Sequence, residues 1–289
     1  MGAPGAARAG RGPLRGAADG AAGRRWTDAE LRAAGFPPAR VRRWFQAHHG
    51  LTFHGYCRAR RLGGALGRIR HGEPVTTAAL GQGYESLSGF HEAFRKLTGS
   101  SPTAARATTT LTVTRLPTPL GPMVAVATEA ALCLLEFGER RALETELGKL
   151  LRARNGLFVP GSNAVLDRVA AELDRYFAGA LRDFDLPLAP QGTPFQRAVW
   201  AALREIPYGA TRSYADVARA VGRPQAVRAV GAANGANPIP ILIPCHRVVG
   251  SDGSLTGYGG GLWRKRRLLE LEGGWAPSSD SIRAPQRLQ

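Results

Sequence analysis

The chain has 289 residues, long enough for two or three small domains, and a hydrophobic content of 44% that allows a core to form. No apolar run is long enough for a membrane span and the first residues lack a signal-peptide stretch, so we expect a cytoplasmic protein and no membrane partner. The formal net charge of +17 favours a polyanionic partner such as DNA, which would associate the protein with the nucleoid, although an arginine-rich genome bias could also produce it.

Three cysteines, an odd and low number, argue against a disulfide framework and exclude a four-cysteine zinc site within this chain. No pair of them has the spacing of metal ligands, so we expect no metal and no cofactor. Cys133 lies within an apolar run, where a buried structural thiol is expected.

Residues 1–25 consist mainly of Gly, Ala, Arg and Pro and predict a disordered basic arm. A start codon assigned too far upstream would explain the same composition.

Residues 26–107 have helical periodicity throughout. Thr27 is a candidate helix cap, and Pro37-Pro38 can open the second helix. A basic helix over residues 53–69 then separates this pair from two further helices, at 75–80 and 86–97. The pattern predicts two helix-turn-helix units joined by a linker helix, although a helical bundle without a nucleic-acid role would look similar.

The two halves resemble the tandem helix-turn-helix domain of AraC-type regulators. The matching residues are Gly35-Phe36, Trp44-Phe45, Gly50 and Arg61-Leu62, then Gly83-Tyr84, Ser88, Phe90, Phe94-Arg95-Lys96, Gly99 and Ser101-Pro102. The resemblance implies promoter DNA as a partner and makes Arg43 and Ser88 candidate DNA contacts. Glu92 departs from the family, which often carries an arginine there, so the second recognition helix is expected to hold DNA either weakly or differently.

Residues 108–187 predict a small α/β lobe. β-branched and apolar runs indicate strands at 108–114, 123–127 and 131–137, and helical spacing indicates helices at 140–154 and 163–179.

Residues 188–275 are mainly helical and contain a third helix-turn-helix pattern. Helices are predicted at 194–205, from the cap Ser213 to 221, at 224–233 and at 263–272, with a long loop from 237 to 261. Residues 276–289 are polar and predict a loose tail.

Cys245 and His246 are adjacent, behind a stiff proline-rich approach that begins at Asn237. A thiol is a good nucleophile only as the thiolate, so His246 is a candidate base. Glu272 on the last helix is the candidate carboxylate that orients this imidazole. Taken alone, the dipeptide favours a buried thiol beside a surface histidine over a reactive pair.

The surrounding residues resemble O6-alkylguanine-DNA alkyltransferases, strongly over 188–275 and loosely over 108–187. The matching runs are Ala226-Val227-Arg228-Ala229-Val230-Gly231, Asn237-Pro238, Pro244-Cys245-His246-Arg247-Val248-Val249, Gly257-Tyr258-Gly259-Gly260 and Leu268-Leu269-Glu270-Leu271-Glu272-Gly273. The resemblance implies that Cys245 accepts the alkyl group, His246 takes its proton through a water, Glu272 polarises His246, and Asn237 shapes the loop.

The same resemblance implies contacts with the DNA substrate. Tyr214 would rotate the target phosphate and donate to the leaving guanine, Arg228 would enter the duplex in place of the flipped base, and Tyr258 would wall the guanine pocket. Gly259 departs from relatives with serine, which puts the substrate range in doubt. The remaining candidate contacts with DNA or substrate are Val248 and Ser213.

Together the segments resemble Ada-type bifunctional proteins without their N-terminal zinc module. The expected fold is a multidomain α and α/β chain: an all-α tandem helix-turn-helix domain, a ribonuclease H-like α/β lobe and a mainly α, winged-helix-like alkyltransferase domain. The resemblance implies single-turnover repair of O6-alkylguanine, and also O4-alkylthymine, in double-stranded DNA by a monomer, with RNA polymerase as a further partner. The alternative is a transcription regulator that uses the alkyltransferase domain as a lesion sensor.

Overall fold

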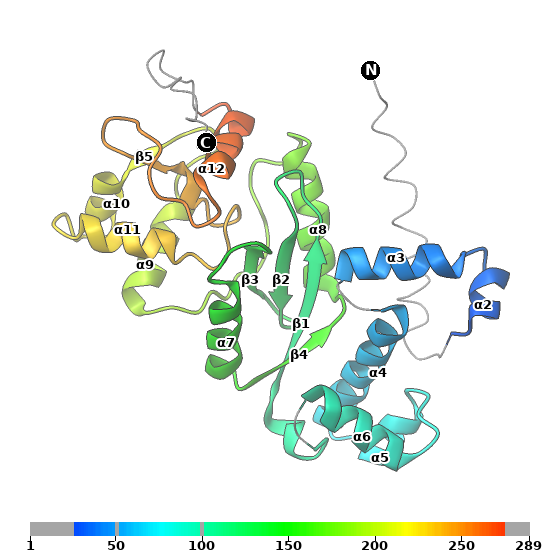
Figure 1. The fold of residues 1–289 in the computed structure, drawn as a ribbon. Coiled ribbons are helices and arrows are strands. Elements are labelled where there is room, and N and C mark those ends of the chain that lie inside the picture. Colours follow the sequence, from blue (N-terminus) through cyan, green and yellow to red (C-terminus); the bar gives the residue numbers. More distant parts are fainter. Residues whose placement is uncertain (1–25, 50–51, 99–100, 275–289) are drawn as a thin grey trace, which may run out of the picture. The chain divides into compact units, whose positions relative to one another are not determined.

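The computed structural model describes residues 26–49, 52–98 and 101–274, so the predicted arm and tail lie outside the described residues. The chain forms two compact units, each assembled from separate stretches of sequence (Figure 1). Unit 1 comprises 1–117, 124–130 and 145–167, and unit 2 comprises 118–123, 131–144 and 168–289. No helix among the described residues is both long and apolar enough to cross a membrane.

The described part of unit 1 starts with five helices, and each corresponds to a helix predicted from the sequence. Thr27 caps the first with a full capping box, in which Thr27 and Glu30 satisfy each other's backbone amides. The helices are α2 (Asp28–Ala33), α3 (Pro38–His49), α4 (Phe53–Arg70), α5 (Val75–Leu80) and α6 (Leu87–Thr98).

Each predicted helix-turn-helix unit has its own apolar core. In the first, Phe45 packs edge-on against Phe53 with ring centroids 5.0 Å apart. In the second, Leu62 and Leu66 of α4 pack with Phe90 and Phe94 of α6. The long helix α4 therefore contributes to both cores, which explains its apolar content despite its many arginines.

A four-stranded sheet with the order β3-β2-β1-β4 follows. The strands are β1 (Thr109–Leu116), β2 (Met123–Ala127), β3 (Leu132–Phe137) and β4 (Gly156–Pro160), and the helices of this region are α7 (Leu143–Ala153) and α8 (Ala164–Phe177). β4 pairs parallel with β1, from Thr109 opposite Gly156 to Val113 opposite Pro160. β4 was not predicted from the sequence, whereas β1, β2 and β3 were.

Within unit 1, α4 packs against one face of β4. Leu157 contacts the core cluster of the second helix-turn-helix unit. A Cβ on Gly63 would lie only 2.5 Å from Cγ1 of Val159, so the helix backbone and this strand approach closely. Beside them, Arg60 donates to the carbonyl oxygen of Ser162 at 2.9 Å. The predicted DNA-binding domain and part of the α/β lobe thus share a packed surface.

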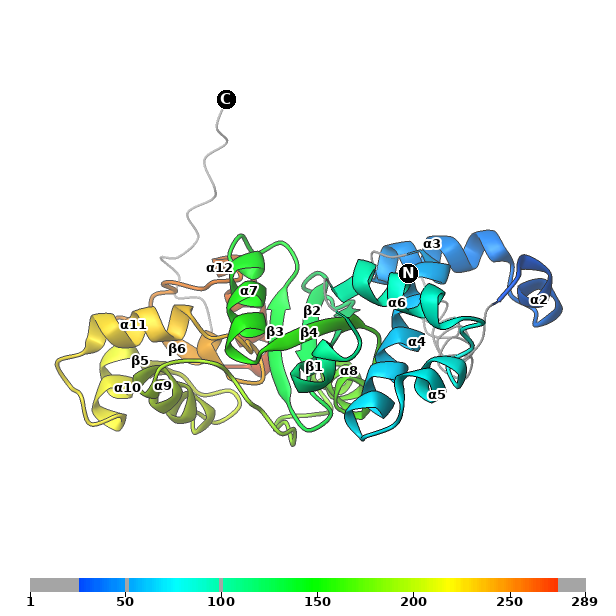
Figure 2. The ribbon, with the colours of Figure 1, turned by 90° about the horizontal axis from the view of Figure 1, so that it is seen from below.

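Unit 2 holds the segments predicted to carry the chemistry. Its elements after α8 are α9 (Pro194–Arg204), β5 (Arg212–Ser213), α10 (Tyr214–Ala220), α11 (Val227–Gly235), the 3-10 turn η2 (Cys245–Arg247), β6 (Val248–Val249) and α12 (Leu262–Glu272). α9, α10 and α11 lie together in both views (Figures 1 and 2). The helix predicted to start at Pro224 instead begins at Val227, because Pro224 belongs to a turn.

Candidate active site

The loop after α11 is held by Asn237, which is 2% exposed. Its side-chain nitrogen donates to the carbonyl oxygen of Ile243 at 2.8 Å, and its oxygen accepts from the amide of Ile239 at 3.0 Å. Between these anchors Ile241 has φ of 76°, a left-handed conformation that a β-branched residue adopts only when its surroundings impose it. This tethered loop delivers Cys245 at the start of η2.

Cys245 is almost fully enclosed, with 4% of its surface exposed. Burial raises the pKa of its thiol to about 11, and a hydrogen bond from the Asn237 side chain acts in the opposite direction. The resting group at neutral pH is therefore the thiol, and reaction requires a base to remove its proton.

Glu272, at the end of α12, is the centre of a buried hydrogen-bond network. Its Oε1 lies 2.9 Å from Nε2 of His246 and accepts from the hydroxyl of Tyr176 at 2.7 Å. Arg247 donates from Nε to Oε2 at 2.8 Å and from Nη2 to Oε1 at 3.0 Å. Burial alone would raise the pKa of Glu272, but the hydrogen bonds from His246 and Arg247 lower it to about 2. The group is thus an anion throughout the physiological range.

The ionised Glu272 determines which His246 nitrogen is basic. A carboxylate only accepts hydrogen bonds, so Nε2 of His246 carries the proton and Nδ1 is left with a free lone pair. Burial lowers the pKa of His246, which keeps the imidazole neutral at pH 7. Within the described part of the chain no atom hydrogen-bonds Nδ1, so this nitrogen is available to accept a proton.

A second set of contacts joins α10, α12 and the loop that carries Tyr258. The Tyr214 hydroxyl donates to the carbonyl oxygen of Thr256 at 3.2 Å. Lys265, fully buried on α12, donates from Nζ to the same carbonyl at 2.6 Å and to that of Val248 at 2.5 Å. Burial lowers the pKa of Lys265 to about 8. The tyrosine and the lysine therefore fix this loop beside the segment of Cys245.

Comparisons of the sequence with known proteins identify the family. Residues 194–274 match the family model "6-O-methylguanine DNA methyltransferase, DNA binding domain", and residues 111–190 match its "ribonuclease-like domain". A methylated-DNA–protein-cysteine methyltransferase of Methanosarcina barkeri is 48% identical over 158 residues, which cover 53% of this chain and 92% of the relative. The chain belongs to the methylated-DNA–protein-cysteine methyltransferase family.

Two more relatives come from Mycobacterium tuberculosis. A methylated-DNA–protein-cysteine methyltransferase of that organism is 60% identical over 107 residues, or 37% of this chain and 65% of the relative. A crystal structure of the M. tuberculosis OGT in complex with DNA is 42% identical, covers 58% of this chain and 96% of that one, and superposes with a TM-score of 0.49. Residues 31–108, outside these matches, match a helix-turn-helix domain model.

Four further residues predicted to contact DNA or substrate lie on or near α10, α11 and β6 of this methyltransferase family member. Arg228 is exposed in the first turn of α11, and Tyr258 is half-buried with its hydroxyl enclosed. Ser213 caps α10 in a capping box with Asp216, and Val248 is buried in β6, opposite Arg212.

Three buried residues of the network were not found from the sequence: Tyr176, Arg247 and Lys265. Arg247 directly follows the Cys245-His246 pair, and that position was the available signal. Tyr176 belongs to the predicted helix 163–179 and Lys265 to the predicted helix 263–272. Only the fold brings Tyr176 to Glu272 and Lys265 to the Thr256 carbonyl.

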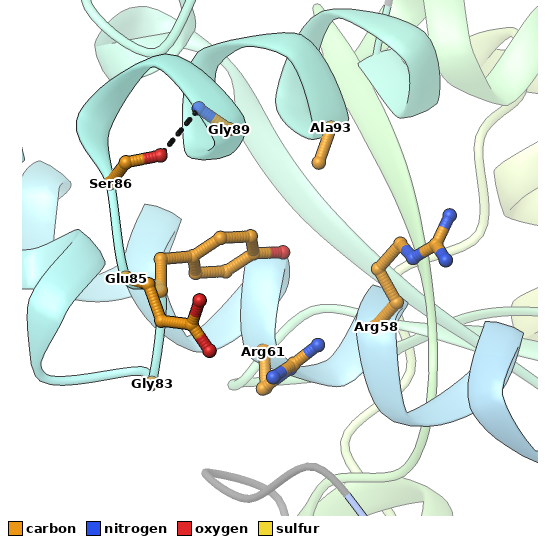
Figure 3. A pocket seen from close by; sticks show the side chains of 8 residues that line it. Arg58, Arg61, Gly83, Glu85, Ser86, Gly89 and Ala93 are labelled. Carbon is orange, nitrogen blue, oxygen red and sulfur yellow. Dashed lines mark hydrogen bonds between the residues drawn. The ribbon is translucent and has the colours of Figure 1, made fainter.

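In unit 1, the side chains of Arg43 on α3 and Ser88 on α6 are exposed, as contacts with DNA require. A cavity of about 250 Å³ lies between α4 and the start of α6, and Figure 3 shows Arg58 and Arg61 beside it. The guanidinium of Arg61 lies 5.2 Å from the centroid of the Tyr84 ring. These arginines place positive charge within the helix-turn-helix domain.

Proposed function

We propose that this chain repairs DNA by transferring an alkyl group, methyl above all, from O6 of guanine or O4 of thymine to the sulfur of Cys245. The observation that carries the proposal is the buried series of Cys245, His246 and Glu272, in which an anionic carboxylate orients a neutral imidazole next to the thiol in sequence. This is the nucleophile, base and orienting group that thiol chemistry needs.

The reaction begins with removal of the thiol proton. The proton passes from Sγ of Cys245, through one water, to Nδ1 of His246, and the resulting imidazolium is stabilised by Glu272. The thiolate attacks the alkyl carbon, a carbon–sulfur bond forms, and the carbon–oxygen bond breaks with its electron pair moving into the guanine ring. A proton from the Tyr214 hydroxyl neutralises the leaving base; the Tyr214 phenolate then regains a proton from water, and the His246 imidazolium returns its proton to water, so both groups end neutral. The product is a thioether, and with no hydrolytic step the protein acts once.

An atom inside a duplex cannot reach a buried thiol, so the nucleotide must leave the stack, at a cost of about a few kcal/mol. Arg228 is the group that would fill the gap, because it is exposed at the start of α11 and free of the hydrogen-bond network around Cys245. Tyr258 would then lie against the extruded base.

We further propose that the N-terminal domain binds promoter DNA and that this brings the repair protein, as a monomer in the nucleoid, near RNA polymerase. Its support is the helix-turn-helix match over residues 31–108 and the exposure of Arg43 and Ser88 on α3 and α6. If repair were absent, the same observation would favour the alternative of a regulator that senses lesions.

The transfer is tested by incubating the protein with duplex DNA that contains O6-methylguanine and measuring the mass of its peptides. One methyl group should appear on the Cys245 peptide and be lost in Cys245→Ala. Cys133→Ala is the matched control, since Cys133 is an equally buried cysteine on β3 of the α/β lobe. No mass change on the wild-type Cys245 peptide would refute the proposal.

The DNA-binding proposal is tested in the full chain with Arg43→Ala and Ser88→Ala. The double variant should lose salt-sensitive binding to its selected promoter sequence while it keeps methyl transfer to Cys245. Unchanged sequence-specific binding would remove these two residues from the interface.

A further inference from the structure

Arg140, just beyond the end of β3, connects three parts of unit 2. Its Nη1 is paired with the carboxylate of Glu136, and its Nη2 donates to the carbonyl oxygen of Gly235, at the end of α11, at 2.8 Å. Its guanidinium carbon would lie 2.9 Å from a Cβ built on Gly259. One side chain therefore touches the lobe, the helix of Arg228 and the loop that walls the guanine pocket.

The guanidinium occupies the space that a side chain at position 259 would need. Three of its guanidinium atoms, Cζ, Nη2 and Nε, lie within 3.1 Å of the Cβ position of Gly259. The glycine and the arginine thus fit as a pair: a serine at 259 would require Arg140 to move.

The pair of Glu136 and Arg140 is largely removed from water, with 1% and 13% of the two side chains exposed. Glu136 also accepts from the amide of Phe137 at 2.8 Å, which fixes the carboxylate. Both side chains are close enough to Cys245 to act on it electrostatically: the Glu136 charge raises the pKa of the thiol and the Arg140 charge lowers it. Glu136 is fixed by the Phe137 amide, and Arg140 is fixed by Glu136 and by the Gly235 carbonyl. These contacts restrict the Arg140 guanidinium to one position beside Gly259.

The adjacent glycine is also closely packed. A Cβ on Gly260 would lie 2.7 Å from the Phe137 ring and 2.8 Å from the Tyr258 ring, so the loop backbone is pressed between them. Arg140, Gly259 and Gly260 all line one cavity of about 460 Å³. Movement of Arg140 would release the loop at the point where Tyr258 is held.

We propose that Arg140 is a specificity-determining residue whose guanidinium, anchored by Glu136 and Gly235, fixes the loop of Tyr258 and Gly259 and limits the size of the alkyl group that reaches Cys245. The inference rests on the proposed alkyl transfer. On this proposal a methyl group is accepted with the loop as it stands, whereas a benzyl group requires the loop to move, and the contact of Arg140 with Gly259 opposes that movement.

The test compares single-turnover rate constants for O6-methylguanine and O6-benzylguanine in the same duplex. Replacing Arg140 alone would leave the Glu136 charge buried and unpaired, so the main variant is Glu136→Gln with Arg140→Met. We expect its benzyl-to-methyl rate ratio to rise at least fivefold over wild type. Arg175→Met, an exposed arginine on α8 that does not line this cavity, is the control and should leave the ratio unchanged.

Arg140→Lys keeps a positive charge for Glu136 but lacks the fork that also reaches Gly235, so its ratio should rise by a smaller factor. This variant provides the measurement if the double variant does not fold. A ratio equal to that of wild type in a folded variant, with both rates unchanged or lowered by the same factor, would overturn the proposal. Absence of methyl transfer in the wild-type protein would instead overturn the proposed function, so the two failures are distinguishable.

Discussion

At the scale of single residues, the proposed methyl transfer depends on a neutral base, His246, next to a protonated thiol, Cys245. Burial lowers the pKa of His246 and raises that of Cys245 to about 11, so neither group is ionised in the resting protein at pH 7. The carboxylate of Glu272, with a pKa of about 2, supplies the charge that makes proton transfer between them favourable.

The first prediction concerns pH. A base is lost when it is protonated, and the lowered pKa of His246 moves this event below the ordinary value of 6.5. The single-turnover rate of methyl transfer should therefore change little from pH 7.5 down to 6.5 and fall only at lower pH. Rates measured between pH 5 and 8 test this, and a half-maximal rate at pH 6.5 or above would contradict it.

The second prediction concerns Glu272→Gln. Loss of the carboxylate removes the orientation of His246 and leaves Arg247 without its anion, so methyl transfer should slow by about 100-fold or more. Unfolding should also become easier, by about 3 kcal/mol, because a buried guanidinium loses its partner. Urea unfolding and single-turnover kinetics measure the two effects.

Glu270→Gln is the control on the same helix. Glu270 pairs with the exposed Arg266 and Arg267, and such surface pairs contribute little to stability. Both quantities should stay close to wild type, and equal losses in the two variants would show that Glu272 has no special role.

At the scale of elements, the N-cap of α10 positions Tyr214, the proposed proton donor. Ser213 accepts from the amide of Asp216 at 3.1 Å, while the carboxylate of Asp216 accepts from the Ser213 amide at 2.8 Å. Tyr214 is the first residue of the helix that this box starts. By capping α10, Ser213 fixes the backbone of the first helical turn and with it the position of Tyr214.

The third prediction is that Ser213→Ala lowers the free energy of unfolding by about 1 kcal/mol, the usual value of an N-cap. Because the helix start frays, methyl transfer should slow as well. Ser213→Thr, which can still cap, should restore both values. Thermal unfolding and kinetics of the two variants test this, and an alanine variant as stable as wild type would contradict it.

Helices were predictable where the sequence states their ends. Thr27, Thr193 and Ser213 each begin a helix with a capping box, and Gly273 ends α12 in a left-handed conformation. The proline at 224 misled because a proline fits a turn as well as a first helical turn. Local signals of this kind predict where helices begin and end, but they do not predict which strands pair.

Long-range contacts were not predictable from one sequence. β4 is a five-residue strand that ends in proline, and it gains its identity from pairing with β1, more than forty positions earlier. Cys245 and His246 could be found because they are adjacent within a characteristic run. Arg140 could not, because its partners Gly235 and Gly259 are separated from it by about a hundred residues.

At the scale of the molecule, unit 1 joins the helix-turn-helix domain to strands of the α/β lobe. The contact depends on Gly63, the only kind of residue that lets α4 approach Val159 so closely. Gly67, on the same helix, has no atom within 4 Å of its Cβ position. Both glycines lie in the interior of α4, but only Gly63 packs closely against another element.

The fourth prediction uses this pair. Alanine is better than glycine in a helix by about 1 kcal/mol, so Gly67→Ala should stabilise the protein by up to that amount. Gly63→Ala should destabilise it instead, because the new methyl group overlaps Val159. Denaturant unfolding of both variants decides, and stabilisation by both would show that α4 does not rest on β4 in solution.

The packing of α4 on β4 also bears on how such a fusion can evolve. β4 is the last strand of its sheet, and Leu157 faces the helix core rather than water. A descendant that lost residues 26–107 would expose this apolar strand at a sheet edge, where it could pair with other chains and aggregate. Polar substitutions on β4 would therefore have to precede loss of the helix-turn-helix domain. This requirement favours retention of the fused domain.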